Sequence, residues 1–73
     1  MKADALAQHI EAALPGAKAE VYTRDTVHFD AIVTCACFEG MSKLEQQRKV
    51  MNCVQDLISS GDVHAFSLKT KVG

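Results

Sequence analysis

The sequence predicts an α+β domain, a two-layer sandwich in which two helices cover one face of a three-stranded mixed sheet. Apolar residues recur at helical spacings of three and four in two segments and alternate with polar residues in three others. The order is helix, strand, strand, helix, strand. A short polar link favours an antiparallel hairpin, and a helical crossover favours a parallel third strand. Without repeats or linkers, residues 1–73 are predicted to form one domain.

The first helix is predicted over residues 3–14. Its apolar stripe consists of Leu6, Ile10, Ala13 and Leu14. Pro15 and Gly16 end the helix, because proline cannot continue the hydrogen-bond ladder and glycine tolerates the reversal of the chain. His9 lies beside the stripe, so we expect this histidine at the boundary with solvent.

Two strands are predicted over residues 17–22 and 27–37, joined by a polar link at residues 23–26. A period of two divides the second strand between two faces. The face expected toward the helices carries Val27, Phe29, Ala31, Val33, Cys35 and Cys37, and the other carries His28, Asp30, Ile32, Thr34, Ala36 and Phe38. The third strand is predicted over residues 62–69, where apolar and polar residues alternate again.

The second helix is predicted to begin at Ser42 and to end at Gly61. Ser42 and Glu45 have the spacing of a capping box, in which the serine side chain accepts from a free amide and the glutamate reaches back. The stripe expected to face the sheet is Leu44, Val50, Met51, Val54, Leu57 and Ile58. The outer side is expected to carry Gln46, Arg48, Lys49 and Asp56.

The composition is balanced, with 48% hydrophobic residues, 23% charged residues and a formal net charge of −1. This balance argues against a strongly basic surface for DNA or anionic membranes. No apolar run reaches the roughly 18 residues of a membrane span, and none follows Lys2 as in a signal peptide. Three cysteines, an odd number, favour free thiols in a reducing compartment. We therefore expect a cytoplasmic protein that does not bind membranes.

Cys35 and Cys37 are the first candidates for chemistry. On a regular strand they would lie about 6.5 Å apart on one side, which is long for a disulfide. They also lack the second pair that a zinc site needs, since Cys53 stands alone on the second helix. We interpret the cysteines as small buried or half-buried hydrophobic residues. A redox-responsive homodimer through Cys53, Cys35 or Cys37 is an alternative.

His64 and His28 are the candidate metal ligands. His64 lies near the entry of the third strand, and His28 lies near the entry of the second. Imidazole is a common ligand for zinc, copper and iron, whereas a half-buried structural role is the alternative for a histidine on a strand. No local signature links a nucleophile to a base, so we expect no enzymatic activity.

Basic residues on the second helix and third strand are candidates for a nucleic-acid interface. They are Lys43, Arg48, Lys49, Lys69 and Lys71. A helix that follows a turn and a glycine is compatible with helix-turn-helix or KH-like binding of DNA or RNA. The alternative is a solvated face, because Glu39, Glu45 and Asp56 interleave with these bases.

Residues 38–70, FEGMSKLEQQRKVMNCVQDLISSGDVHAFSLKT, resemble the signature region of the BolA family. The FEG turn, the Ser-x-x-x-x-x-Arg-x-Val helix and the VHAFSLKT strand follow the family's order and spacing. The strand pair VYTRDTVHFDAIVTCACFEG is similar too, and the GMS start of the helix is typical of the IbaG-type (YrbA-like) branch. The resemblance implies a class II KH-like fold.

The resemblance also implies a non-enzymatic partner of monothiol CGFS glutaredoxins, in iron–sulfur cluster trafficking or iron homeostasis. The two proteins would share a 2Fe–2S cluster, with His64 as a ligand and the thiolates supplied by the glutaredoxin and glutathione. Relatives usually place a second ligand in the loop between the first two strands. Residues 23–26 contain neither cysteine nor histidine, so His28 is the nearest substitute. The resemblance implies a nucleic-acid-binding transcriptional regulator of the stress response as the alternative.

Overall fold

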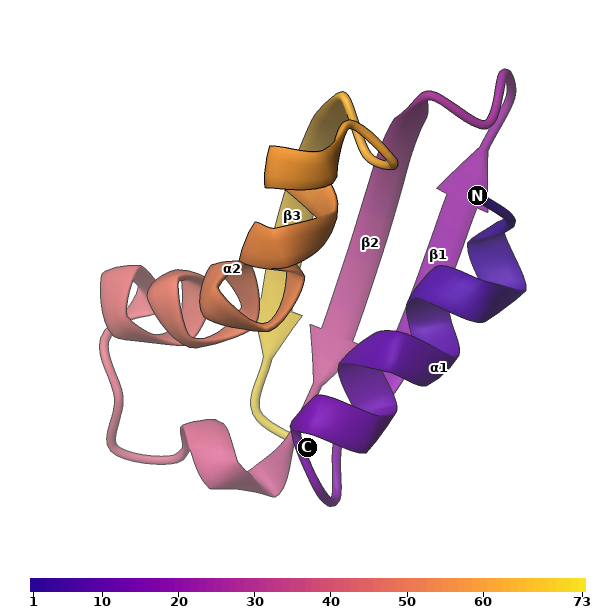
Figure 1. Cartoon of the computed structure of the whole chain (residues 1–73). Coiled ribbons are helices and arrows are strands. Elements are labelled where there is room, and N and C mark those ends of the chain that lie inside the picture. Colours follow the sequence, from indigo (N-terminus) through magenta and orange to yellow (C-terminus); the bar gives the residue numbers. More distant parts are fainter.

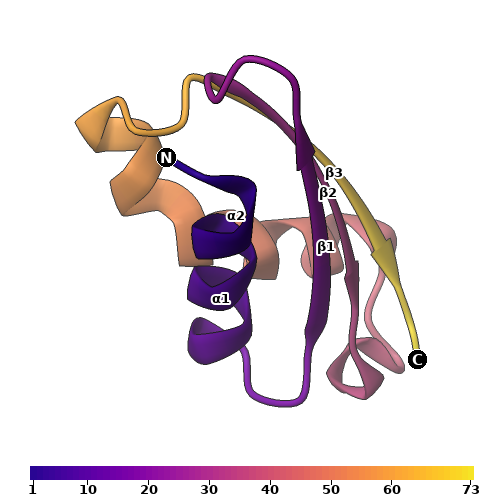
Figure 2. The ribbon, with the colours of Figure 1, turned by 90° about the vertical axis from the view of Figure 1, so that its right-hand side faces the viewer.

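The computed structural model describes residues 1–73 as two layers, with both long helices on one face of a three-stranded sheet (Figure 1). In chain order the elements are α1 (Ala3–Ala13), β1 (Lys18–Thr23), β2 (His28–Thr34), a short 3-10 helix η1 (Ala36–Phe38), α2 (Lys43–Ser60) and β3 (Ala65–Lys71). Figure 2 shows that the opposite face of the sheet is bare. The predicted α+β order and layering are confirmed.

The sheet is mixed, as predicted, with the order β1-β2-β3. β1 pairs with β2 in antiparallel register, so that Tyr22 is opposite Asp30. β2 pairs with β3 in parallel register, so that Asp30 is opposite Ser67. Alternation along β2 turns Phe29, Ala31 and Val33 toward the helices and His28, Asp30 and Ile32 toward the bare face.

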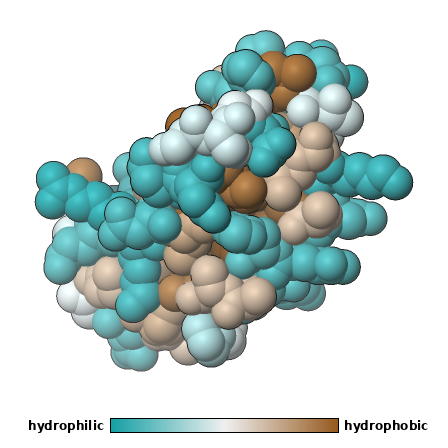
Figure 3. All heavy atoms as spheres, in the orientation of Figure 1, coloured by the Kyte–Doolittle hydropathy of each residue, from teal (hydrophilic) through white to brown (hydrophobic).

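The core lies between the sheet and the helices. It is built from buried apolar residues contributed by every layer: Leu6, Ile10, Leu14, Phe29, Val33, Cys35, Phe38, Val50, Val54 and Val63. Figure 3 shows that the helix side of the surface is mainly hydrophilic, with smaller hydrophobic areas between the polar side chains. No helix combines the length and the apolar character needed to cross a membrane.

The capping box at the start of α2 is present as predicted. The Ser42 hydroxyl accepts from the Glu45 amide at 3.1 Å, and the Glu45 carboxylate accepts from the Ser42 amide at 3.0 Å. The bonds from the Ser42 backbone and side chain lower the pKa of Glu45, because they favour its charged form. At the other end, Gly61 has a φ of +85°, the left-handed conformation that ends a helix.

The expected faces of α2 are wrong at two positions in its first turns. Leu44, expected toward the sheet, is 56% exposed, whereas Gln46, expected outside, is only 4% exposed. Gln46 donates a hydrogen bond to the carbonyl of Met41 at 2.9 Å and accepts one from the Thr70 hydroxyl at 2.7 Å. Both polar ends of the amide are thus satisfied, which is what permits its burial.

The second and third strands also differ from their predicted bounds. β2 ends at Thr34, and η1 then turns the chain, so Phe38 is fully buried and Cys37 is exposed. The prediction had these two side chains on the opposite faces, because it continued the strand period through residue 37. β3 begins at Ala65, three residues later than predicted, since residues 62–64 bend between Gly61 and the sheet.

Candidate functional site

The two candidate metal-ligand histidines come from segments that meet at one end of the sheet. His28 is the first residue of β2, and it is paired with Ala65, the first residue of β3. His64 immediately precedes that pair, and its amide donates to the carbonyl of Val27 at 3.2 Å. Figure 1 shows this end, where the β1–β2 hairpin and the connection from α2 to β3 run beside each other. Both histidines are exposed.

The hairpin loop is organised by Asp25. One of its carboxylate oxygens accepts hydrogen bonds from the amides of Val27 at 3.0 Å and His28 at 2.8 Å. The other lies 2.6 Å from Nδ1 of His28. The pKa of Asp25 is held well below its ordinary range, first by the His28 amide, then by the His28 ring and the Val27 amide.

The Asp25 carboxylate fixes the role of the two His28 ring nitrogens. Because the carboxylate is ionised, it can only accept, so Nδ1 of His28 carries the proton and donates. In the neutral ring, the free lone pair then lies on Nε2, and the side chain of His28 is 69% exposed. A carboxylate behind an imidazole is the usual second layer around a metal-ligating histidine.

His64 is held differently. Its backbone is fixed by the bond to Val27, but no hydrogen bond within the chain engages its imidazole. Nowhere do three or more His, Cys, Asp or Glu side chains gather as a set that could hold a metal ion. A metal centre at this end of the sheet would take its remaining ligands from outside the chain.

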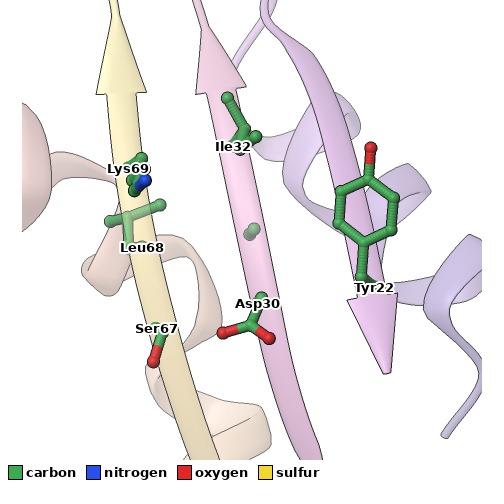
Figure 4. Close-up of a pocket in the computed structure, with 7 residues that line it drawn as sticks. Tyr22, Asp30, Ile32, Ser67, Leu68 and Lys69 are labelled. Carbon is green, nitrogen blue, oxygen red and sulfur yellow. The ribbon is translucent and has the colours of Figure 1, made fainter. Parts of the chain in front are cut away.

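Two hollows lie beside this end and on the bare face of the sheet. The first, of about 400 Å³, is lined by Tyr22, Thr23, Arg24, Asp25, His28 and Asp30. The second, of about 280 Å³, is lined by Tyr22, Asp30, Ala31, Ile32, Ser67, Leu68 and Lys69. Figure 4 shows Tyr22 on β1, Asp30 and Ile32 on β2, and Ser67 and Lys69 on β3 around the second hollow. Tyr22 and Asp30 line both hollows, so the site around Asp25 and His28 (the loop site) is continuous with the hollow on the bare face of the sheet.

The candidate nucleic-acid residues are divided between α2 and β3. Lys43 donates to the backbone carbonyl of Thr70. Arg48 and Lys49 are exposed on α2, which covers the inner face of the sheet. Lys69 lines the hollow on the outer face (Figure 4), and Lys71 is exposed at the end of β3.

The cysteines depart from the prediction. Cys35 and Cys37 form a disulfide, with their Cα atoms 5.1 Å apart. The prediction assumed extended geometry through both residues, whereas the 3-10 turn that follows Cys35 shortens their separation. Cys53 is a free, half-buried thiol, and burial raises its pKa.

His9, expected at a boundary, is half-buried and joins the two helices. Its Nε2 lies 2.8 Å from the carbonyl oxygen of Cys53 and 3.7 Å from a carboxylate oxygen of Asp56. Sequence reasoning missed the role of Asp25. A signal was available, because an aspartate in a polar link can accept hydrogen bonds from backbone amides two or three residues further on, as in an Asx turn.

The comparisons with known proteins agree on one family. A family model described as BolA-like protein matches residues 4–72. A relative from Buchnera aphidicola, described as an uncharacterized protein, is 31% identical over 48 residues, which are 66% of this chain and 60% of that protein. The match thus spans less than two thirds of that relative's length.

Solved structures reproduce the whole fold. The structure of a bolA protein homologue from Coxiella burnetii is 36% identical, with a TM-score of 0.83, and the match covers 99% of this chain and 91% of that one. The solution structure of yeast Fra2 is 30% identical, with a TM-score of 0.76, and the match covers 99% and 80% of the two chains.

Proposed function

This chain belongs to the BolA-like protein family, and from that premise we propose that it holds a 2Fe–2S cluster jointly with a monothiol CGFS glutaredoxin. The proposed setting is iron–sulfur cluster trafficking or iron homeostasis in the cytoplasm, with no catalytic activity of its own. The observation that carries the proposal is the location of two exposed histidines at the same end of the sheet, with Asp25 orienting the ring of His28.

In this proposal the chain supplies imidazole ligands and the partner supplies thiolates. His64 is the principal ligand, because its imidazole is exposed and has no competing hydrogen bond. His28 offers Nε2 as a second ligand. Histidine replaces cysteine on one iron in other 2Fe–2S centres, so the donor set suits the cluster. Glutathione and the glutaredoxin cysteine complete the coordination.

The absence of a complete local ligand set supports sharing with a partner. A binding site that is completed only in a complex keeps its ligands accessible until the partner arrives. The exposed hairpin loop and the adjoining hollow of about 400 Å³ are where the partner is proposed to dock. A nucleic-acid role has no comparable support, because the basic side chains are divided between α2 and β3 and the formal net charge of the chain is −1.

The test is co-expression with a CGFS-type glutaredoxin, followed by anaerobic purification and visible absorption and circular dichroism spectra. We expect a co-purified complex whose spectrum differs from that of the glutaredoxin alone. His64→Ala is expected to abolish this spectrum while the far-ultraviolet spectrum of the isolated chain is unchanged. His9→Gln is the matched control, because His9 lies between the helices, away from the site. A cluster spectrum unchanged in His64→Ala would overturn the ligand assignment.

A further inference from the structure

We propose that Cys35 and Cys37 form a reversible thiol–disulfide exchange centre that reacts with small thiols and disulfides of the glutathione class. This inference does not depend on the proposed cluster site. Cys35 directly follows β2 and lies seven residues beyond His28, which corresponds to about 23 Å of extended chain. The cysteines therefore lie at the end of β2 (Figure 1), opposite the end at which the histidines lie.

The two sulfur-bearing residues differ in their access to solvent. Cys35 is 2% exposed and belongs to the core, beside residues such as Val33 and Phe38. Cys37 is exposed on η1. An attacking thiolate must approach a sulfur atom directly, so its target is the sulfur of Cys37. The buried cysteine is thereby assigned the role of leaving group.

The environment of the Cys35 sulfur suits that role. The backbone amide of Cys37 donates a hydrogen bond to it at 3.2 Å. When the disulfide opens, negative charge develops on this atom, and a donor already aimed at it stabilises the thiolate. A stabilised leaving thiolate departs faster.

The bridge is not what holds this part of the fold together. The Cys35 amide donates to the carbonyl of Lys71 at 3.0 Å, and the Cys35 carbonyl accepts from the Phe38 amide at 3.1 Å. A disulfide that closes a loop of three residues also removes little entropy from the unfolded chain. The pair can therefore open without the loss of β2 or η1, as a reversible redox site requires.

The reaction balances with two molecules of a small thiol. A thiolate attacks Cys37 Sγ, the sulfur–sulfur bond breaks, and its electron pair goes to Cys35 Sγ, which takes a proton from water. A second thiolate attacks the small-molecule sulfur of the mixed disulfide and releases Cys37 as a thiolate. Two small thiols are thus oxidised to one disulfide while the protein disulfide is reduced to two thiols. The reverse sequence oxidises the pair.

The test uses the full chain with the substitution Cys53→Ser, so that Cys35 and Cys37 are the only cysteines that can react. The oxidised, folded protein is incubated with millimolar reduced glutathione, and the reaction is quenched with acid. The free thiols are then alkylated and counted from the mass of the protein by mass spectrometry. We expect two thiols to appear together. Recovery of thiols only after denaturant is added would overturn the proposal.

Two single-cysteine variants test the division of roles. With oxidised glutathione, Cys35→Ser is expected to form the mixed disulfide on Cys37 at least about tenfold faster than Cys37→Ser forms it on Cys35. In urea the two rates should become equal. Equal rates in the folded protein would contradict the assignment. If Cys35→Ser does not fold, the alkylation rates of the two thiols in the reduced Cys53→Ser protein provide the same comparison, with Cys37 expected to react faster.

Discussion

At the scale of single residues, the loop site depends on one carboxylate. Asp25 accepts three hydrogen bonds, two from backbone amides and one from the His28 ring. These bonds close the turn and set the position of the ring at the start of β2. In the same loop the non-glycine residue Thr26 has a φ of +61°, and its amide donates to the Thr23 hydroxyl at 3.0 Å.

Acidification should therefore weaken the fold through Asp25. Its folded pKa lies below its ordinary value of 3.8, so its contribution is complete above about pH 5 and is lost as the pH falls toward the folded pKa. Urea unfolding from pH 6 to pH 2 should show wild type more stable than Asp25→Asn at pH 6, with the difference shrinking on acidification. A difference independent of pH would contradict this linkage. Asp30→Asn is the control on the adjoining strand.

At the scale of elements, the first turns of α2 are attached to the end of β3 by a buried amide. Gln46 connects the carbonyl of Met41 with the hydroxyl of Thr70, and the neighbouring Lys43 reaches the Thr70 carbonyl. This junction holds the helix on the sheet at the end opposite the histidines. Apolar contacts of Val50 and Val54 continue the attachment along the helix.

Truncating that amide should be costly. Gln46→Ala leaves a buried hydroxyl and a carbonyl without partners and creates a small cavity, so we expect a loss of about 2–3 kcal/mol in the free energy of unfolding. Gln47→Ala is the matched control, because Gln47 is exposed beside it, and we expect a change within about 0.5 kcal/mol. Urea unfolding at neutral pH measures both. Equal, small effects would show that the junction contributes nothing.

At the scale of the whole molecule, the core is small and shared by all layers. A chain of this size is expected to have a net stability of about 4–11 kcal/mol. Phe38 lies in η1, a helix of only three residues, and its side chain is fully buried. It is part of the hydrophobic core and so attaches η1 to the rest of the fold. Truncation of this one side chain is therefore expected to remove a substantial fraction of the net stability.

Phe38→Ala should accordingly remove a large fraction of the free energy of unfolding. The expected loss is about 3–5 kcal/mol, from lost burial and an incompletely collapsed cavity. Thermal unfolding followed by far-ultraviolet circular dichroism measures it. Tyr22→Ala is the aromatic control, since Tyr22 is 58% exposed on the bare face of the sheet. A melting temperature near that of wild type for Phe38→Ala would show that η1 packs loosely.

The sequence alone predicted the order of the elements, the layering and the helix ends. These follow from local causes: the periods of apolar residues, the Ser42 and Glu45 capping pair, and the glycine at position 61. It also placed His28 and His64 at strand entries, and through the family resemblance it identified them as candidate ligands. Parallel pairing of β2 with β3 then brings the two histidine-bearing segments to the same end.

The identity of the buried polar groups and the points at which the strands end could not be predicted without the folded structure. Gln46 is buried because Thr70, 24 residues away in sequence, satisfies its amide, and no periodicity can register so distant a partner. Cys35 and Cys37 bond because β2 ends one residue earlier and a 3-10 turn replaces the extended chain. Side-chain partners set by long-range packing, unlike local periods, exist only once the chain has folded.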